Sequence, residues 1–373
     1  MIKSIGLKGF KCFNEKNLIP LKQVTVLYGK NGRGKSTVAQ SLLLLAQSMR
    51  KYNSLNYLVV NDGYVSLGLF EELINKDSTN KSFEVDIESE NGDSISAVFE
   101  PSEIYPHLGA LVSQKVNGKE TFETMSGSGD GTGTVEYANT LSSGVTSDNA
   151  ILQGLKDIIY VSADRNGPVN ESRIEYQQEE VPLSPVGQNI INVIAECGQA
   201  FAEELEHNLS YILSGASLSI RFRQDKIELG LSSSNGGSTM RPINVGFGYS
   251  YVLPVIVAAM LAKPGSVVII ENPEAHLHSG AQSRLANFLI SQSISKKFQL
   301  ILETHSDHVI NGLRVATKSN TVTPSDTVIL HFSHNEDAII PEVKEIRCDK
   351  DGNLSDYPDD FMDEWTKQLL ELV

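Results

Sequence analysis

Apolar positions over the first hundred residues follow a strand pattern, interrupted by one helical segment. From Ser36 to about Met49 apolar residues recur at helical spacing, and a hydroxyl residue suits the helix start. The sequence Glu90-Asn91-Gly92-Asp93 is a turn signal between two alternating segments, so it predicts a hairpin. Two-residue alternation or short apolar runs predict strands at 2–8, 24–28, 82–88 and 94–99.

The middle of the chain changes character twice. Residues 113–150 are rich in Gly, Ser and Thr, which predicts a mobile insertion or a surface hairpin. Residues 158–161 resemble a buried strand that ends in the polar turn 162–168. Beyond it the patterns predict a helix from Gln188 to about Leu213, a hairpin over 217–231 and a helix that opens near Ser250.

The most hydrophobic stretch, 251–270, has about the length of a membrane span. Pro254 and the group Lys263-Pro264-Gly265 interrupt it, so it is expected as a helix, a turn and a buried strand. The amino-terminal residues lack the apolar core of a signal peptide, so no export is indicated. No membrane partner is expected, because the longest apolar stretch is interrupted. The chain is therefore expected in the cytoplasm.

Composition and charge narrow the class of protein. The 373 residues are 40% hydrophobic and 21% charged, as in a soluble globular protein of several domains or one elaborated α/β domain. The net charge of −15 argues against a broad nucleic-acid-coating surface, although a local basic patch stays compatible with it. Cys12, Cys197 and Cys348 match no metal or redox spacing and suit a reducing compartment.

A complete phosphate-binding loop lies between the apolar strand 24–28 and the helix that follows. Its glycines let backbone N–H groups converge on a β-phosphate, Lys35 supplies a cation, and Ser36 offers a hydroxyl to Mg²⁺. We therefore expect the chain to bind a nucleoside triphosphate with Mg²⁺. The predicted nucleotide-binding residues are Gly29, Lys30, Asn31, Gly32, Arg33, Gly34, Lys35, Ser36 and Thr37.

Two later strands end in residues that suit the same chemistry. Val267–Ile270 are β-branched and lead to Glu271, which a parallel sheet would place at its carboxyl edge as a Mg²⁺ ligand. Residues 298–303 repeat the pattern and lead to Thr304-His305-Ser306. His305 is thus a candidate sensor of the γ-phosphate.

Taken together, these segments resemble the ABC-type ATPases of the RecF, structural-maintenance-of-chromosomes (SMC) and overcoming-lysogenization group. They resemble in particular the stand-alone predicted ATPases of bacteria and archaea, many of which occur among phage-defence genes. Besides 29–36 and 271–278, the segments that carry the resemblance are a first hairpin at 7–13, Tyr160–Arg165, a signature segment at 244–250, a histidine switch at 304–308 and the tail 357–361.

The resemblance implies an α/β P-loop NTPase fold. The ABC-ATPase-type head would have a mixed central sheet flanked by helices, together with an amino-terminal antiparallel β subdomain. Residues 1–373 would form one ATPase domain, which includes the insertion 113–150, a helical signature subdomain at 188–262 and carboxyl-terminal strands and a helix at 320–373.

A homodimer with composite ATP sites is also implied by the resemblance. Each ATP would contact the P-loop of one copy and the signature segment of the other, through Gly246 and Gly248. Gly246 stands where the family usually has serine, so its contact would use backbone N–H groups. Nucleotide binding and dimerisation would then be one equilibrium.

Several residues depart from the family pattern or allow two interpretations. Asn272 replaces the glutamate that usually follows the Walker B acid, so Glu274 would act as general base or only cap the next turn. His278 stands where transporters often carry an aspartate. Arg165 is interpreted first as a solvated side chain, and alternatively as a contact to phosphate or to the partner subunit. Lys11 has a similar, weaker claim on the nucleotide, and the neighbouring phenylalanines are expected to pack rather than stack on adenine.

The favoured hypothesis is a slowly hydrolysing, ATP-gated dimeric switch in phage defence. It would control a separate effector such as a nuclease or toxin, with DNA contact as an alternative. A second hypothesis is a non-hydrolysing scaffold, in which Asn272 marks a lost base. The divergent signature and the long segment between Ser36 and Glu271 argue against a transporter subunit. The residues after His305 are too few for the nuclease domain of overcoming-lysogenization proteins.

Overall fold

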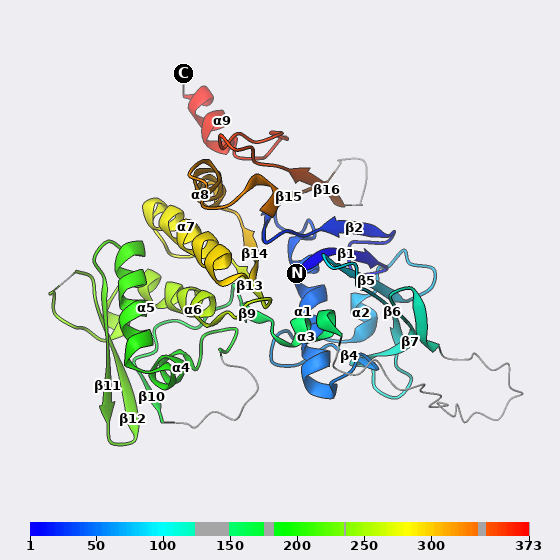
Figure 1. The fold of residues 1–373 in the computed structure, drawn as a ribbon, viewed down its shortest axis with the longest axis horizontal. Coiled ribbons are helices and arrows are strands. Elements are labelled where there is room, and N and C mark those ends of the chain that lie inside the picture. The colour runs from blue at the N-terminus through cyan, green and yellow to red at the C-terminus, as the bar shows by residue number, and fades with distance from the viewer. Residues whose placement is uncertain (124–148, 175–182, 235, 335–340, 373) are drawn as a thin grey trace, which may run out of the picture. The chain divides into compact units, whose positions relative to one another are not determined.

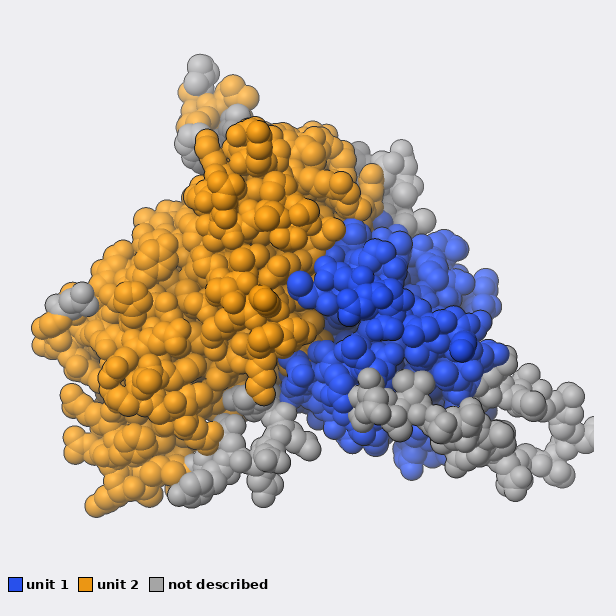
Figure 2. Space-filling model, in the orientation of Figure 1, with its two compact units in different colours: residues 1–21, 36–157, 334–341 blue, residues 22–35, 158–333, 342–373 orange. Residues whose placement is uncertain are grey.

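The computed structural model describes residues 1–123, 149–174, 183–234, 236–334 and 341–372. The helices and strands (Figure 1) divide into two units, which Figure 2 shows in separate colours. Unit 1 comprises Met1–Leu21, Ser36–Asp157 and His334–Pro341, and unit 2 comprises Lys22–Lys35, Ile158–Ser333 and Glu342–Val373.

Unit 1 contains an antiparallel sheet in the order β2-β1-β5-β6-β7-β4, with β8 paired to β7. Side chains along β5 and β6 alternate between buried and partly buried, because only one face of each strand packs on the core. The strands are β1 (Ile2–Lys8), β2 (Asn17–Pro20), β4 (Tyr57–Val59), β5 (Phe83–Ser89), β6 (Ser94–Pro101), β7 (Leu108–Val116) and β8 (Lys119–Glu123).

Aromatic rings and one long helix fill the core of unit 1. Phe10 stacks on Phe83 with ring centroids 4.4 Å apart, and Phe99 lies beside Phe83. Helix α1 (Lys35–Tyr52) is accompanied by the shorter helices α2 (Phe70–Leu73) and α3 (Ala150–Lys156). Within the Gly-rich range 113–150, residues up to 123 belong to the β7–β8 hairpin, and most of the remaining range lies outside the described residues.

The sheet of unit 2 has the order β16-β15-β3-β14-β13-β9, in which β15, β3, β14, β13 and β9 run parallel. The strands β3 and β14 are buried along their whole length and β13 is buried up to Ile270, as expected for parallel strands covered on both faces. The strands are β3 (Val24–Gly29), β9 (Ile159–Val161), β13 (Val267–Glu271), β14 (Gln299–Thr304), β15 (Thr327–His334) and β16 (Pro341–Ile346).

A small antiparallel sheet, β10-β12-β11, and several helices complete unit 2. Its strands are β10 (Glu171–Arg173), β11 (Ser217–Arg223) and β12 (Lys226–Ser232), so the hairpin predicted at 217–231 is confirmed. The helices are α4 (Ile190–Cys197), α5 (Gln199–Ile212), α6 (Phe247–Leu261), α7 (Ser279–Lys296), α8 (Asp307–Lys318) and α9 (Glu364–Glu371), with 3₁₀ turns η1 (Pro242–Asn244) and η2 (Pro324–Asp326).

Two helix predictions need correction. The single helix expected from Gln188 to Leu213 is two helices, α4 and α5, because Gly198 between them has a φ of 84° that breaks the helical path. Helix α6 begins at Phe247 rather than near Ser250, with Gly246 as its amino-terminal cap.

The segment 251–270 does form a helix, a turn and a buried strand, as predicted. Among the helices formed by the described residues, none combines the length and apolar character that a membrane crossing requires. The antiparallel sheet of unit 1 and the helix-flanked sheet of unit 2 confirm the predicted α/β class.

Candidate nucleotide site

The candidate site lies at one edge of the unit 2 sheet. Parallel pairing aligns Glu271 with Glu303, and Thr304 with Tyr28, so β13, β14 and β3 end at the same level. Strand β9 ends beside Ile270. The carboxyl edge of this sheet therefore brings together the loop after β3, the Glu271 turn, the His305 segment and the turn after β9, which is where α/β sheets bind ligands.

Glycines shape the loop after β3. Gly29, Gly32 and Gly34 have φ values of 137°, 73° and 102°, which residues with a side chain rarely adopt. At Gly29 there is also no room, because a Cβ atom would lie 2.3 Å from the carbonyl oxygen of Phe332 on β15. The local fold of the loop thus depends on the spacing of these glycines.

Lys35 ends the loop and is only 3% exposed. Its ammonium group donates to the carbonyl oxygens of Gly29 and Lys30, both at 2.8 Å, so the side chain curls over the loop it belongs to. Burial lowers the pKa of Lys35, and the charge of Glu303 acts in the opposite direction. The arrangement holds a cation against a loop whose geometry suits phosphate oxygens.

Glu271 is the last residue of β13, and its carboxylate points toward the turn after β9. Oε2 accepts a hydrogen bond from the Ala163 N–H at 3.2 Å, and the Tyr160 hydroxyl is a second partner. Burial raises the pKa of Glu271, and these hydrogen bonds together with Arg165 partly offset the rise. Burial likewise raises the pKa of Tyr160.

The donor set at this edge fits Mg²⁺ better than a transition metal. No cluster of three or more His, Cys, Asp or Glu side chains that could hold a metal occurs in the part of the chain that the structure describes. Mg²⁺ does not need such a cluster, since one or two protein oxygens, substrate phosphates and water complete its shell. Glu271 supplies a carboxylate, and Ser36 follows Lys35 at the start of α1.

The turn after Glu271 brings Glu274 to the His305 segment. Asn272 has a φ of 46°, a conformation that asparagine tolerates, and its N–H donates to the Glu303 carbonyl at 2.8 Å. Glu274 Oε1 accepts from the His305 N–H at 3.0 Å. The Glu274 carboxylate therefore joins the turn after β13 to the end of β14.

Two buried oxygen atoms in this turn have no hydrogen-bond partner within the described ranges. They are Asn272 Oδ1 and Glu274 Oε2. Buried polar oxygens of this kind need a partner, and a bound water is a chemically suitable one. Both atoms come from the two residues that the sequence singled out for water activation.

His305 lies beside the phosphate-binding loop. Partial burial and the nearby Lys35 ammonium lower its pKa, although the residue reaches solvent, and a hydrogen bond with the Gly29 backbone opposes them. A lowered pKa keeps the imidazole neutral near pH 7, so one ring nitrogen can donate while the other accepts. This places His305 next to Lys35, as a sensor of the γ-phosphate would require.

Arg165 is not a solvated side chain, so that first interpretation is wrong. The residue is 3% exposed, and its guanidinium donates to three backbone carbonyls. These belong to Ser162 at 2.9 Å, Glu271 at 2.8 Å and Asn272 at 2.6 Å. The buried guanidinium is thus held by backbone carbonyls at the ends of β9 and β13.

The signature segment forms the start of α6, where Gly246 is the cap and Gly248 lies in the first turn. A Cβ atom at Gly248 would lie 2.6 Å from the His276 carbonyl oxygen, so the segment packs closely on the loop after β13. His278 caps α7, with Nδ1 accepting from the Gly280 N–H at 3.3 Å. Both helix starts border a hollow of about 500 Å³, which Phe247 and Arg284 also line.

Three predicted residues belong to unit 1. The Lys11 ammonium donates to the Gln40 side chain on α1, and burial lowers the pKa of Lys11. Ser36 is partly buried and Thr37 is buried in the first turn of α1, where the Thr37 hydroxyl accepts a contact of 3.7 Å from Cys12 Sγ. The neighbouring Phe10 and Phe13 are fully buried, which confirms that these rings pack in the core.

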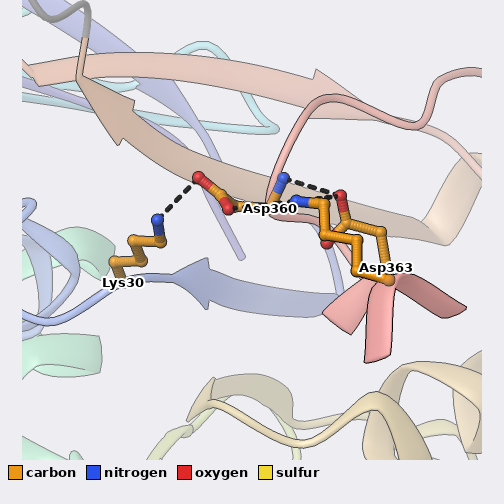
Figure 3. Close-up of polar contacts among 4 residues, drawn as sticks. Lys30, Asp360 and Asp363 are labelled. Atoms are coloured by element: carbon orange, nitrogen blue, oxygen red, sulfur yellow. Dashed lines mark hydrogen bonds and ion pairs between the residues drawn. The ribbon is translucent and has the colours of Figure 1, made fainter. Parts of the chain in front are cut away.

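The sequence does not predict two contacts made by the end of β3 and the loop that follows it. The Tyr28 hydroxyl donates to Asp307 at 2.8 Å, and a buried tyrosine at a strand end is a signal that such a partner exists. Lys30 pairs with Asp360 at 2.7 Å, and Asp360 and Asp363 share Lys367 (Figure 3). Nothing local to the sequence of the tail 357–361 indicates a contact with the loop.

Comparison with protein families gives three matches along the chain. Residues 1–175 match the family described as AAA ATPase domain, and residues 135–311 match AAA domain, putative AbiEii toxin, Type IV TA system. Residues 322–372 match a family of unknown function, DUF3696. None of the curated proteins compared with the chain is similar to it.

Solved structures of SMC heads resemble the fold over nearly the whole chain. An SMC head bound to the C-winged helix domain of ScpA is 18% identical, with a TM-score of 0.55 and coverage of 93% of this chain and 97% of that one. The SMC head from Pyrococcus furiosus, bound to the C-terminal domain of ScpA, is 15% identical, with a TM-score of 0.53 and coverage of 100% and 99%. That from Thermotoga maritima is 14% identical, with a TM-score of 0.50 and coverage of 92% and 98%.

These matches support a RecF/SMC-like ABC-type ATPase. The ATPase families match the ranges that hold the P-loop and the Glu271 turn, and the SMC heads share the fold that positions them. The resemblance inferred from the sequence is thereby confirmed.

Proposed function

We propose that this RecF/SMC-like ATPase is an ATP-gated dimeric switch that hydrolyses ATP slowly and controls a separate effector protein in phage defence. The observation that carries the proposal is the convergence of the P-loop, Glu271, Glu274 and His305 at one sheet edge. Lys35 and the loop N–H groups would hold the phosphates, and Ser36 and Glu271 would hold Mg²⁺. When bound, Mg²⁺ would neutralise phosphate charge and orient the γ-phosphate.

We expect slow turnover because the residue directly after Glu271 is an amide, Asn272, rather than a carboxylate. Asn272 can orient a water but cannot accept its proton, whereas the Glu274 carboxylate can. Glu274 is held by the His305 N–H, and its second oxygen has no partner in the described part of the chain. We therefore assign Glu274 as the general base and His305 as the γ-phosphate sensor.

Dimerisation is supported by the start of α6. Its first N–H groups, at Gly246 and Gly248, border a hollow that exposes Phe247 (56% exposed) and the α7 cap. Free N–H groups at the start of a long helix favour an anion. The anion in this proposal is the γ-phosphate held by a second copy of the chain.

The partner is proposed to be a protein rather than DNA. A net charge of −15 disfavours a broad contact with phosphate backbones. Two of the similar SMC heads are bound to domains of a second protein, ScpA. By analogy, this head would transmit its nucleotide state to a separately encoded partner.

A size measurement tests the proposal. Sedimentation of the full chain with ATP and Mg²⁺ should show a dimer, and the sample without nucleotide should shift toward monomer. Lys35→Ala should remove the shift, because it takes away the cation that faces the phosphates. An unchanged size distribution in the parent, combined with no thermal stabilisation by ATP, would end the switch proposal.

A non-hydrolysing scaffold is the second candidate function, and Asn272 is the residue that favours it. In that case ATP would still drive the size shift, but purified parent protein would release no phosphate. Measuring turnover and size on the same sample therefore separates the two functions.

A further inference from the structure

A buried arginine ties two strand ends at the candidate site. Arg165 lies in the turn after β9. Two of the three acceptors of its guanidinium are the carbonyl oxygens of Glu271 and Asn272, at the end of β13. Its third acceptor, the Ser162 carbonyl, belongs to the turn after β9. Both N–H groups of Nη1 are used in these bonds. The side chain thus acts as a clamp between the two turns.

A few backbone hydrogen bonds and the Arg165 side chain fix the shape of the clamped turn. Asn272 has a φ of 46°, which disfavours most residues; its N–H donates to the Glu303 carbonyl, and its own carbonyl accepts from Arg165 and from the Ala275 N–H at 3.1 Å. The hydrogen bond from Arg165 to the Glu271 carbonyl holds the end of β13, from which the Glu271 carboxylate reaches the Ala163 N–H. The Asn272 peptide also affects how Glu274 reaches the His305 N–H, since only Pro273 lies between Asn272 and Glu274.

The charge of Arg165 suits this place. A buried cation is costly unless groups of opposite polarity surround it. Here the carboxylates of Glu271 and Glu274 favour the charged form, and the ring of Tyr251 lies 5.8 Å from the guanidinium carbon. Burial lowers the pKa of Arg165 to about 10, which still leaves it protonated at neutral pH.

We propose that Arg165 is a positioning residue of the ATPase site. It fixes the Glu271–Asn272 turn so that the Glu271 carboxylate faces the Mg²⁺ position, without itself touching the nucleotide. The planar guanidinium fork serves several carbonyls at once, and a lysine ammonium cannot reproduce that geometry. This inference rests on the proposed function, because it assumes that Glu271 serves Mg²⁺.

Mg²⁺ titration of Arg165→Met tests the inference. Two quantities are measured: the Mg²⁺ concentration that gives half of the thermal stabilisation by ATP, and the Kd of ATP in EDTA. We expect the Mg²⁺ midpoint to rise about tenfold or more, and the Kd in EDTA to stay within about threefold, as expected when only metal-site geometry is disturbed. Arg165→Lys should give an intermediate midpoint.

Arg314→Met is the matched control. Arg314 also donates to a backbone carbonyl, that of Gly352 at 2.8 Å, and to Asn311, but it lies on α8 away from the Glu271 turn. Its loss should lower the melting temperature without moving the Mg²⁺ midpoint. A merely structural role of Arg165 would give that same pattern, which would overturn the inference.

Other outcomes are equally decisive. A tenfold loss of ATP affinity in EDTA would mean that Arg165 contacts phosphate directly, and would overturn the positioning role. If Arg165→Met does not fold, Arg165→Lys is judged by the same two quantities, and a midpoint equal to the parent's rejects the proposal. A parent protein without any Mg²⁺-dependent stabilisation by ATP would remove the proposed function and this inference together.

Discussion

Replacing Glu274 with glutamine tests the assignment of the general base. The amide oxygen can keep the hydrogen bond from the His305 N–H, so the turn should survive. Hydrogen bonds to a charged acceptor are worth about 1 kcal/mol more than neutral ones, which sets the expected loss of stability. An amide cannot accept a proton from water, and loss of a general base slows turnover by about 10²–10⁴-fold. This corresponds to a rise of about 3–5 kcal/mol in the activation barrier.

The assay is phosphate release at saturating ATP and Mg²⁺, with ATP affinity measured on the same samples. Glu206→Gln is the matched control, because Glu206 also accepts from a backbone N–H, that of Leu218 at 3.3 Å, but lies on α5. Turnover of Glu274→Gln within threefold of the parent, with ATP affinity retained, would refute the assignment of Glu274 as base.

Asn272→Glu extends the test to the position where related ATPases carry their glutamate. The left-handed conformation at this residue should cost about 1–2 kcal/mol of stability. If the missing carboxylate limits the rate, turnover should rise above that of the parent. A parent without turnover, whether or not Asn272→Glu gains activity, would favour the scaffold.

Further predictions concern the loop and its strand. His305→Ala should keep ATP affinity and slow turnover, and equal turnover in both proteins would exclude the sensor role. Gly29→Ala should lower the free energy of unfolding by about 2–5 kcal/mol in urea titrations, because its Cβ would lie 2.3 Å from the Phe332 carbonyl oxygen in a left-handed backbone. Burial lowers the pKa of His331, so the unfolded chain binds more protons just below the ordinary pKa, and stability falls as the pH drops through that range. His331→Phe should therefore flatten the melting temperature between pH 7.5 and 5, and an unchanged slope would contradict this.

Local patterns predicted the elements that build the site. The β-branched run before Glu271 predicts a buried strand, and the glycine spacing predicts the P-loop. Both lie where parallel strands end. The break at Gly198 was missed because apolar periodicity continues on both sides of it. The start of α6 was missed because Gly246-Phe247-Gly248 has the composition of a turn.

Partners that are distant in sequence were beyond prediction. Arg165 binds backbone carbonyls 106 and 107 positions away, and every residue offers such a carbonyl, so residue type gives no clue. Lys30 and Asp360 are 330 positions apart. A charged side chain in a polar turn is usually solvated, and only the tertiary fold reveals the exceptions.

The position of β3 in its sheet has a consequence for biosynthesis. Its hydrogen-bonding neighbours are β14 and β15, so Val24 pairs with Leu300 on one side and Thr327 on the other. A ribosome that adds about 5–20 residues per second would finish these neighbours on the order of 14–60 s after β3. During that interval an apolar strand waits in the nascent chain without its sheet. Chaperones that shield apolar segments during translation should therefore raise the yield of active protein.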